Sequence, residues 1–202
     1  MVTDDGGVVS RPYTPTHVTT TRFEIPIKIY DDGRLTQHVR HWKVGDSIEW
    51  RGPYNEDVDL LNKKVPCLLL VAGGTGIAPF VRVIDETLKD DENETRIRLL
   101  YCVRSGADIL FEEQFSEWAR HWNFIIVICG DGVEKDSLPY LFKCVNTRLT
   151  EEHFQEQLKT LSRGDLDNVL VSVCGRTTLE KDVVNFAKRA GVDPKKILRF
   201  PG

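Results

Sequence analysis

The segment Leu68-Leu69-Leu70-Val71-Ala72-Gly73-Gly74-Thr75-Gly76-Ile77-Ala78-Pro79-Phe80 decides the fold of this chain. Its apolar run predicts a strand that is covered on both faces, and its glycines predict a tight turn. Pro79 suits the first turn of a helix, where its missing N–H costs nothing. Because the free N–H groups and the positive dipole end at a helix start favour anions, the segment predicts a phosphate site. A dinucleotide is therefore the first ligand hypothesis.

The glycine turn by itself leaves an alternative open. Its spacing departs from the dinucleotide pattern G-x-G-x-x-G, because Pro79 stands where the third glycine would be. A glycine-rich strand-to-helix turn that binds no ligand would have the same sequence pattern. The rest of the sequence is needed to choose between the two interpretations.

Composition limits the classes of protein that this chain can be. It has 202 residues, of which 41% are hydrophobic and 29% charged, as expected for one large or two small packed domains. The net charge is −4 and no lysine- or arginine-rich run occurs, so nucleic-acid binding has no electrostatic support. The sequence contains neither an apolar run of about 20 residues nor a signal peptide. We therefore expect an intracellular protein, cytoplasmic or on the cytosolic face of an organelle membrane.

Widely spaced cysteines, odd in number, argue against a disulfide framework. Most of them lie in or beside apolar runs, which indicates reduced and buried thiols. No C-x-x-C pair is present and the histidines show no ligand spacing, so we expect no metal site. The cysteines are Cys67, Cys102, Cys129, Cys144 and Cys174.

From Pro66 onward, predicted strands alternate with predicted helices, which is typical of an α/β fold with a parallel sheet covered on both faces. Ligands of such sheets bind beyond the carboxyl ends of the strands, where the Gly73–Gly76 turn and Cys174-Gly175 fall. Thr177 and Glu180 predict a capping box at the last helix. The predicted strands are 67–72, 97–103, 124–129, 169–174 and 197–200, and the predicted helices are 77–88, 111–120, 151–161 and 179–190.

Up to about Asn62 the pattern is different. Residues 22–30 alternate in part, as a half-exposed strand does, and residues 46–53 indicate another strand that ends in a turn. Asp31-Asp32-Gly33 is a turn signal, and residues 35–42 predict a short helix. The N-terminal part is therefore predicted to be a β-rich unit that differs from the parallel sheet.

Four motifs follow one another along the chain: Arg11-Pro12-Tyr13-Thr14-Pro15, Gly33-Arg34-Leu35-Thr36, Gly73–Pro79 and Cys174-Gly175. Their order resembles that of the ferredoxin-reductase-like flavoenzymes. Within that family the chain looks most like the NADH-cytochrome b5 reductase branch, especially its cytochrome b5 reductase-like members. Residues 42–53 also resemble that branch, and the resemblance runs from about Arg11 to Phe200.

The resemblance implies two domains. Part of an antiparallel β-barrel FAD-binding domain would occupy residues 1–62, and an α/β NAD(P)-binding domain would occupy residues 63–202. In the family, about half of the barrel precedes the first motif. The chain is therefore expected to be N-terminally truncated and to lack any upstream membrane anchor.

The resemblance also implies roles for residues. Arg11 would pair with the FAD pyrophosphate, Tyr13 would pack against the flavin ring, and Thr14 would take part in catalysis by a hydrogen bond near flavin N5. Thr75 would touch the flavin from the second domain. The implied cofactor-binding residues are Arg11, Pro12, Tyr13, Thr14, Ile27, Lys28, Tyr30, Gly33, Arg34, Leu35 and Thr36 in the first domain, and Gly73, Gly74, Thr75, Gly76, Pro79, Cys174 and Gly175 in the second.

Ordinary structural roles compete with four of these assignments. Arg11 and Tyr13 could be ordinary strand residues, although the full set of motifs speaks against that. Thr36 could simply cap a helix, which is compatible with phosphate binding as well. Cys174 fits a small buried residue better than a nucleophile.

The implied function is that of an FAD-dependent oxidoreductase, which takes hydride from NADH at flavin N5 and passes electrons to a haem protein such as cytochrome b5. NADH is favoured over NADPH because Ile128–Asp131 contains no cation and Asp131 would repel a 2′-phosphate, whereas Arg104-Ser105 keeps NADPH open. The alternative is a catalytically silent module that binds a nicotinamide nucleotide or a partner protein.

Overall fold

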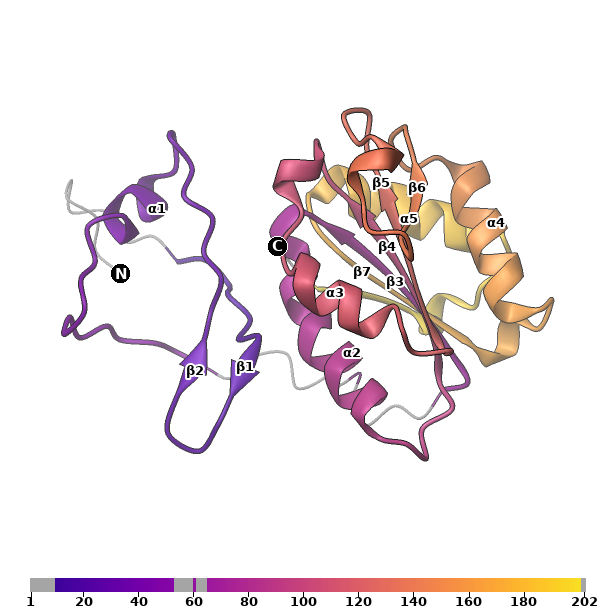
Figure 1. The fold of residues 1–202 in the computed structure, drawn as a ribbon, viewed down its shortest axis with the longest axis horizontal. Coiled ribbons are helices and arrows are strands. Elements are labelled where there is room, and N and C mark those ends of the chain that lie inside the picture. Colours follow the sequence, from indigo (N-terminus) through magenta and orange to yellow (C-terminus); the bar gives the residue numbers. More distant parts are fainter. Residues whose placement is uncertain (1–9, 53–59, 61–64, 201–202) are drawn as a thin grey trace.

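The computed structural model describes residues 10–52, 60 and 65–200. Its larger part is built around a sheet of six parallel strands in the order β6-β5-β4-β3-β7-β8 (Figure 1). The predicted parallel α/β fold is therefore confirmed. The strands are β3 (Cys67–Gly73), β4 (Arg96–Cys102), β5 (Phe124–Cys129), β6 (Lys143–Val145), β7 (Val169–Cys174) and β8 (Ile197–Phe200).

Continuous apolar runs place the inner strands at the centre of the molecule. Every residue of β3 except Gly73 is buried, and all of β7 is buried. Strands with this composition are stable only where both faces are covered. The register aligns Leu68 of β3 with Ile97 of β4 and with Leu170 of β7, so the glycine turn after β3 and the end of β7 reach the same edge.

Two helices cover each face of the sheet (Figure 1). The helices α2 (Ala78–Lys89) and α3 (Glu112–Trp118) bury Phe80 and Phe115 against one face. The helices α4 (Glu151–Ser162) and α5 (Thr177–Arg189) cover the other face with a second apolar cluster. Short 3-10 turns join these elements: η2 (Gly74–Ile77), η3 (Gly106–Asp108), η4 (Lys135–Ser137), η5 (Leu166–Asn168) and η6 (Pro194–Lys196).

The order of the strands reverses between β3 and β7. The chain moves outward in one direction from β3 through β4 and β5 to β6, and then returns through α4 to start β7 on the other side of β3. Such a reversal leaves a crevice beyond the carboxyl ends of the two central strands, where ligands of open α/β sheets bind. The topology therefore fixes the place of the candidate site.

The N-terminal part departs from the prediction. Among residues 10–52 the structure shows β1 (His17–Val18) paired antiparallel with β2 (Phe23–Glu24), and the helix α1 (Arg34–Val39). The strand predicted over 22–30 ends after Glu24, because Pro26 has no N–H to donate to a ladder. Residues 46–52 form no strand, so the described residues hold antiparallel pairing but no barrel.

The other differences are small. The prediction missed β6, and α5 starts at Thr177 instead of Leu179. The expected capping box at Thr177 is wrong, because Arg176 is the N-cap and no side chain caps this helix. The domain boundary predicted after residue 62 falls outside the described residues. In the described part of the chain, no helix combines the length and the apolarity that crossing a bilayer requires.

Candidate cofactor site

The glycine turn after β3 has the geometry of a ligand-facing loop at one residue in particular. Gly74 has a left-handed φ of 53°, and a Cβ built on it would meet no atom of the described residues within 4 Å, its own chain neighbours apart. Its open side therefore faces space at the carboxyl edge of the sheet. The turn continues as η2 into α2, with Pro79 in the first turn of that helix as predicted.

The other glycines of the turn serve close packing between two loops. A Cβ on Gly76 would lie 2.7 Å from the carbonyl carbon of Cys174 and 3.0 Å from the amide nitrogen of Gly175. A Cβ on Gly175 would lie 3.3 Å from the Cα of Gly73. The segments that follow β3 and β7 thus touch through their backbones, which only glycine allows. The structure brings together the two motifs that the sequence placed at strand ends.

Tyr101 in β4 lies under the glycine turn, and the sequence analysis did not single it out. Its side chain is fully buried, its ring packs edge to face against Phe115 at 5.6 Å, and its hydroxyl donates to the Gly74 carbonyl at 3.1 Å. The Leu110 amide donates to the same hydroxyl at 3.4 Å. Burial raises the pKa of Tyr101 to about 12, so the hydroxyl keeps its proton at neutral pH. A tyrosine within an apolar predicted strand usually needs a polar partner, but the sequence does not show which group that partner is.

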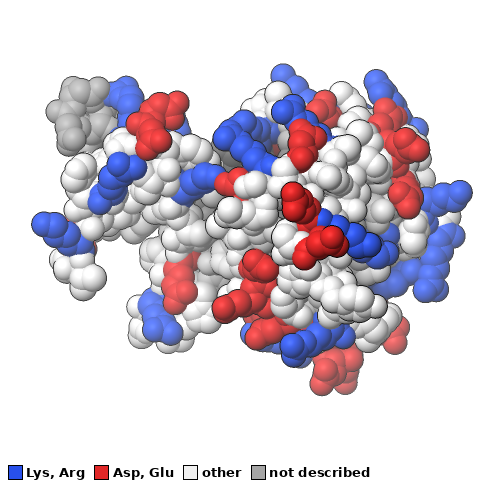
Figure 2. Space-filling model, turned by 45° about the horizontal axis from the view of Figure 1, so that its top comes forward, with Lys and Arg blue, Asp and Glu red and all other residues white. Residues whose placement is uncertain are grey.

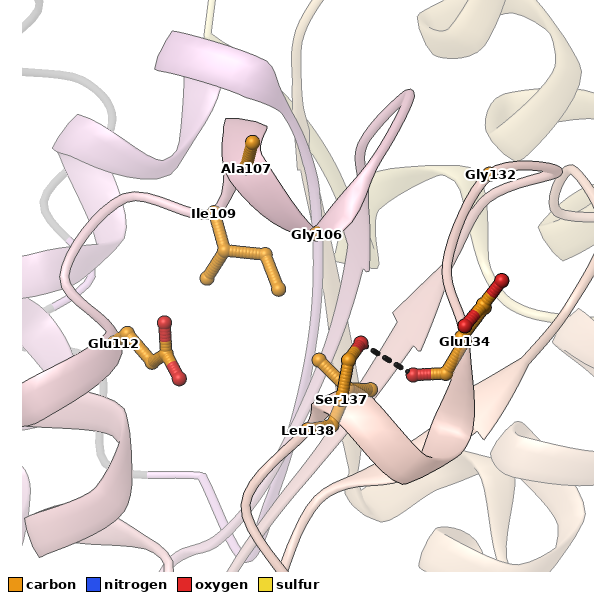
Figure 3. Close-up of a pocket in the computed structure, with 8 residues that line it drawn as sticks. All are labelled: Gly106, Ala107, Ile109, Glu112, Gly132, Glu134, Ser137 and Leu138. Carbon is orange, nitrogen blue, oxygen red and sulfur yellow. Dashed lines mark hydrogen bonds between the residues drawn. The ribbon is translucent and has the colours of Figure 1, made fainter.

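A hollow of about 410 Å³ opens at the same edge of the sheet, between the loops that follow β4 and β5 (Figure 3). Gly106, Ala107 and Ile109 line it from the first loop, and Gly132, Ser137 and Leu138 line it from the second. Its volume lies within the usual range of small-molecule pockets. The sequence analysis considered only the first residues after these strands and so missed most of this lining.

Asp131 follows β5 and pairs with Arg148, which lies outside the Ile128–Asp131 segment considered in the sequence analysis. Its carboxylate accepts from the Arg148 amide at 3.1 Å and from Arg148 Nε at 3.2 Å. The fold therefore brings an arginine to the position where the sequence indicated none. Arg104, after β4, is exposed, and its carbonyl accepts from the Gly132 amide at 3.2 Å.

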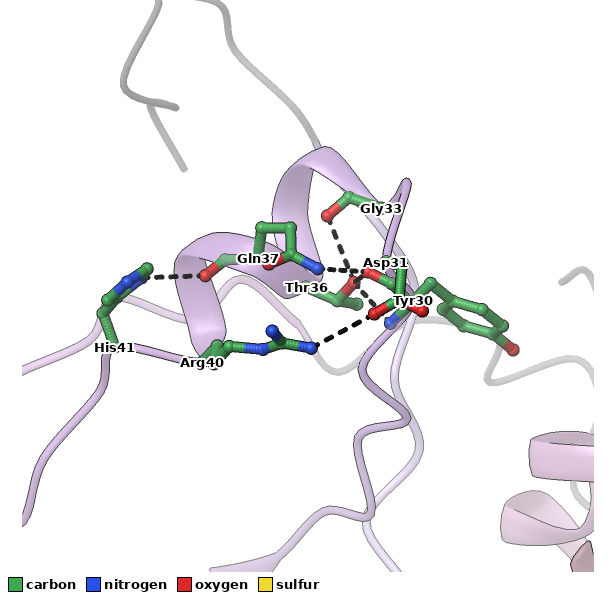
Figure 4. Close-up of polar contacts among 7 residues, drawn as sticks. All are labelled: Tyr30, Asp31, Gly33, Thr36, Gln37, Arg40 and His41. Carbon is green, nitrogen blue, oxygen red and sulfur yellow. Dashed lines mark hydrogen bonds and ion pairs between the residues drawn. The ribbon is translucent and has the colours of Figure 1, made fainter.

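In the N-terminal part, the Tyr30–Gly33 turn is fixed by side chains of α1 (Figure 4). Thr36 is buried, and its hydroxyl accepts from the Tyr30 amide at 3.0 Å and reaches the Gly33 carbonyl at 3.1 Å. Gln37 donates to the Tyr30 carbonyl at 2.6 Å. Thr36 lies in the first turn of α1 but is not its cap, because Gly33 is the N-cap. Its hydroxyl is thus engaged within the turn where FAD pyrophosphate binding was predicted.

The remaining predicted flavin residues lie along the same N-terminal segment. Arg11 is exposed and donates to the Ser10 carbonyl at 2.8 Å. Tyr13 and Thr14 are partly buried, and the Tyr13 ring stands edge to face with Trp50 at 6.2 Å. Trp50 makes similar edge-to-face contacts with the rings of Phe23 and Trp42, at 5.8 and 6.5 Å between ring centres. Four other predicted flavin residues are absent from the lining of the hollow at the carboxyl edge of the sheet: Pro12, Ile27, Arg34 and Leu35. The side chain of Leu35 is buried.

One ion pair joins the N-terminal part to the sheet domain. Lys28 Nζ lies 3.2 Å from the carboxylate of Asp108, which also accepts from the Ser105 hydroxyl at 3.2 Å. The hydrogen bond from Lys28 lowers the pKa of the Asp108 carboxyl. Lys28 therefore contacts the loop whose neighbouring residues line the hollow.

The prediction of buried thiols is confirmed for Cys67, Cys129 and Cys174, whereas Cys102 and Cys144 are partly buried. All five cysteines are free and each lies in a strand of the sheet. Cys174 is 7% exposed, and burial raises its pKa to about 12, which keeps the thiol protonated. Cys174 is thus a small buried residue at the end of β7. Figure 2 shows basic and acidic side chains interspersed over the visible face, so binding of an anion there depends on local groups.

Comparison with known proteins agrees with this geometry. The profile of the oxidoreductase NAD-binding domain family matches residues 70–185, and that of the oxidoreductase FAD-binding domain family matches residues 1–57. The chain is 31% identical to the NADH-cytochrome b5 reductase-like protein of Mus musculus, over 97% of this chain and 62% of that protein. The Homo sapiens protein of the same name is 28% identical, over 95% and 61%. The chain thus spans about three fifths of these relatives.

Solved structures share the fold. The cytochrome b5 reductase domain of Ulva prolifera nitrate reductase superposes with a TM-score of 0.79 at 23% identity, covering 99% of this chain and 81% of that chain. Ferredoxin-NADP+ reductase from Plasmodium falciparum superposes with a TM-score of 0.68 at 18% identity, covering 94% and 76%. The solved structures show the shared fold, and the matched profiles with the sequence relatives show that the chain belongs to the cytochrome b5 reductase and ferredoxin-reductase-like family of FAD- and NAD-binding oxidoreductases.

Proposed function

We propose that this chain is the nicotinamide-binding part, with some of the flavin-binding part, of an FAD-dependent reductase that uses NADH. The observation that carries the proposal is the meeting of the Gly73–Gly76 turn with Cys174-Gly175 at the point where the strand order reverses. Crevices at such points bind dinucleotides in open α/β sheets.

The residues at this edge fit a dinucleotide. The open side of Gly74 would let a phosphate approach the backbone, and the first N–H groups of a helical segment have no partner within it. The adjoining hollow, reached past the end of β4, could take part of the adenosine. Cys174-Gly175 would border the nicotinamide, where the buried thiol offers an apolar, unreactive surface.

The predicted FAD residues fit the cofactor in part. Arg11 is exposed with donors left over for a phosphate, since its bond to Ser10 uses one of five N–H groups. Tyr13 and Thr14 lie together on one segment, as the role of flavin contacts requires. When bound, the flavin would supply the chemistry that accepts hydride at N5 and releases electrons singly. Within this proposal Thr14 donates a hydrogen bond near N5 and Thr75 contacts the flavin from the sheet domain.

NADH is the proposed coenzyme, because Asp131 stands where a 2′-phosphate would approach. Its carboxylate could accept from the ribose hydroxyls, as acidic residues do in NAD sites. Arg148 is paired with Asp131, so its guanidinium is already engaged and does not favour binding of a 2′-phosphate there. The electron acceptor is proposed to be a haem protein such as cytochrome b5, which is supported by the names of the related reductases.

The visible spectrum of the recombinant chain tests this function directly. We expect a yellow protein that oxidises NADH with ferricyanide as a surrogate acceptor and reduces cytochrome b5. Thr14→Val should slow the reduction of the flavin by NADH in a single turnover, whereas Thr20→Val, at an exposed residue between β1 and β2, should not. A colourless chain that binds NAD+ without turnover in added FAD would instead favour the silent nicotinamide-binding module.

A further inference from the structure

The hydroxyl of Tyr101 connects two loops at the candidate site, and it does so from inside the protein. It donates to the Gly74 carbonyl and accepts from the Leu110 amide. A tyrosine hydroxyl has one hydrogen to donate, so both the hydrogen and one lone pair are engaged. The ring that carries it is fully buried and packs against Phe115, which leaves the hydroxyl little freedom to move.

The bond to Gly74 fixes the orientation of a peptide unit. In a trans peptide the carbonyl and the following N–H point in opposite directions. Since the Gly74 carbonyl points to the buried Tyr101 hydroxyl, the Thr75 N–H points away from it, toward the outer side of the turn. Gly74 has a left-handed φ and open space beside it and begins η2, so the hydroxyl adds a buried restraint on the peptide at the start of that helix.

The bond from Leu110 extends the same restraint to the hollow. Leu110 directly follows Ile109, which lines the hollow of about 410 Å³ together with Gly106 and Ala107 (Figure 3). One buried hydroxyl therefore holds both the glycine turn and one wall of the adjoining hollow. A ligand that spans the two would meet both in a preset arrangement, which lowers the ordering cost of binding.

We propose that Tyr101 is a positioning residue for dinucleotide binding, which orients the Gly74–Thr75 peptide and the Ile109–Leu110 wall through its hydroxyl. This inference rests on the proposed function and adds a residue outside the binding surface to it. Its side chain touches no cofactor in this arrangement and acts through the backbone of the two loops. Phenylalanine at this position would keep the buried ring and lose only the two hydrogen bonds.

The test compares Tyr101→Phe with two control variants of the full chain. Phe115→Leu disturbs the packing against the Tyr101 ring but keeps the hydroxyl, and Tyr140→Phe removes a hydroxyl from a side chain that is 99% exposed. NAD+ affinity is measured by calorimetry, and amide hydrogen exchange is measured on the ligand-free protein. We expect Tyr101→Phe to weaken NAD+ binding by up to about tenfold, because binding must then restore an order of the two loops whose cost is at most about that of one net hydrogen bond.

Exchange should rise in Tyr101→Phe within residues 73–77 and 109–111 and stay unchanged in the rest of the sheet. Phe115→Leu should lower the melting temperature at least as much while weakening NAD+ less than twofold. Unchanged exchange in these segments, or an equal loss of NAD+ affinity in Phe115→Leu, would overturn the proposal. A wild-type chain that binds no NAD+ would refute the proposed function instead, and the exchange pattern would still decide whether Tyr101 fixes the turn.

Discussion

Gly76→Ala probes the contact between the two loops at the point where the strand order reverses. The new Cβ would lie 2.7 Å from the Cys174 carbonyl carbon, whereas ordinary contacts begin at 3.4 Å. The Cys174 carbonyl oxygen would lie closer still, so the two loops must separate by several tenths of an ångström or more. Both partners are backbone, which cannot swing aside as a flexible side chain would, so the strain is shared by the ends of β3 and β7.

This displacement sets the expected magnitudes. Overpacking of a tight contact costs roughly 1–3 kcal/mol. For a chain of this size each kcal/mol lowers the melting temperature by about 2–4 °C, so a cost near 2 kcal/mol gives a loss of roughly 4–8 °C. Hydrogen bonds to a phosphate lose their geometry over such a shift, and we expect NAD+ affinity to fall about tenfold or more.

Calorimetric titration with NAD+ and thermal unfolding measure the two effects separately. Gly164→Ala is the matched control, because Gly164 has a φ of 92° and open surroundings in the loop after α4, away from the site. It should lose stability through backbone strain and keep its affinity for NAD+. If Gly76→Ala bound NAD+ as tightly as the wild type, the meeting of the two loops would not shape the binding site.

Three further predictions concern charged groups and a thiol. Asp131→Ser removes the carboxylate that pairs with Arg148, so binding of 2′-phospho-AMP relative to AMP should improve about tenfold in calorimetry. Asp108→Asn should cost under ~1 kcal/mol of unfolding free energy. Because the hydrogen bond from Lys28 lowers the pKa of Asp108, this contribution is present above about pH 4 and is lost as the pH falls through the folded pKa, which urea titrations at several pH values would show. Cys174, whose pKa burial raises to about 12, should resist iodoacetamide at neutral pH until the chain unfolds, as peptide mass spectrometry would report.

The sheet domain could be predicted from the sequence because each of its inner strands carries its own burial signal. The runs that became β3, β5 and β7 are apolar at nearly every position, and they recur at the spacing of strand–helix units. Local patterns of this kind do not depend on contacts that are distant in the sequence. The predicted strand bounds accordingly differ from the observed ones by at most one residue at each end of these three strands.

The elements that the prediction missed depend on distant partners. The strand β6 has three residues and lies at an edge, where its pairing with β5 alone defines it. The strand predicted over 22–30 needed neighbours for its whole length, and the described residues supply only β1. At α5 the Thr177–Glu180 spacing suggested a cap, but the chain is already helical at Thr177. Pro26 was a local signal for the early end of β2, but the other outcomes depend on contacts outside a short window of sequence.

The same distinction applies to the candidate site. Its glycine segments were visible in the sequence, because a glycine determines the backbone conformation at its own position. Tyr101 and Arg148 were not, because their importance arises from contacts 27 and 17 residues away in the chain. The sequence therefore indicated the glycine segments of the candidate site but not the side chains that contact its loops and its acidic group.

The glycines of the turn meet different physical requirements. Gly76 and Gly175 allow the ends of β3 and β7 to approach through their backbones, which a ligand-free strand-to-helix turn would require as well, whereas a Cβ on Gly73 would meet the side chain of Leu179. Gly74 differs, because the space beside it is open and its φ is left-handed. The left-handed φ of Gly74 favours glycine with or without a ligand, whereas the open space beside it is what the proposed phosphate contact needs. Tyr101 holds the adjoining carbonyl inward. The proposal of a dinucleotide site therefore depends more on the surroundings of Gly74 than on the number of glycines in the motif.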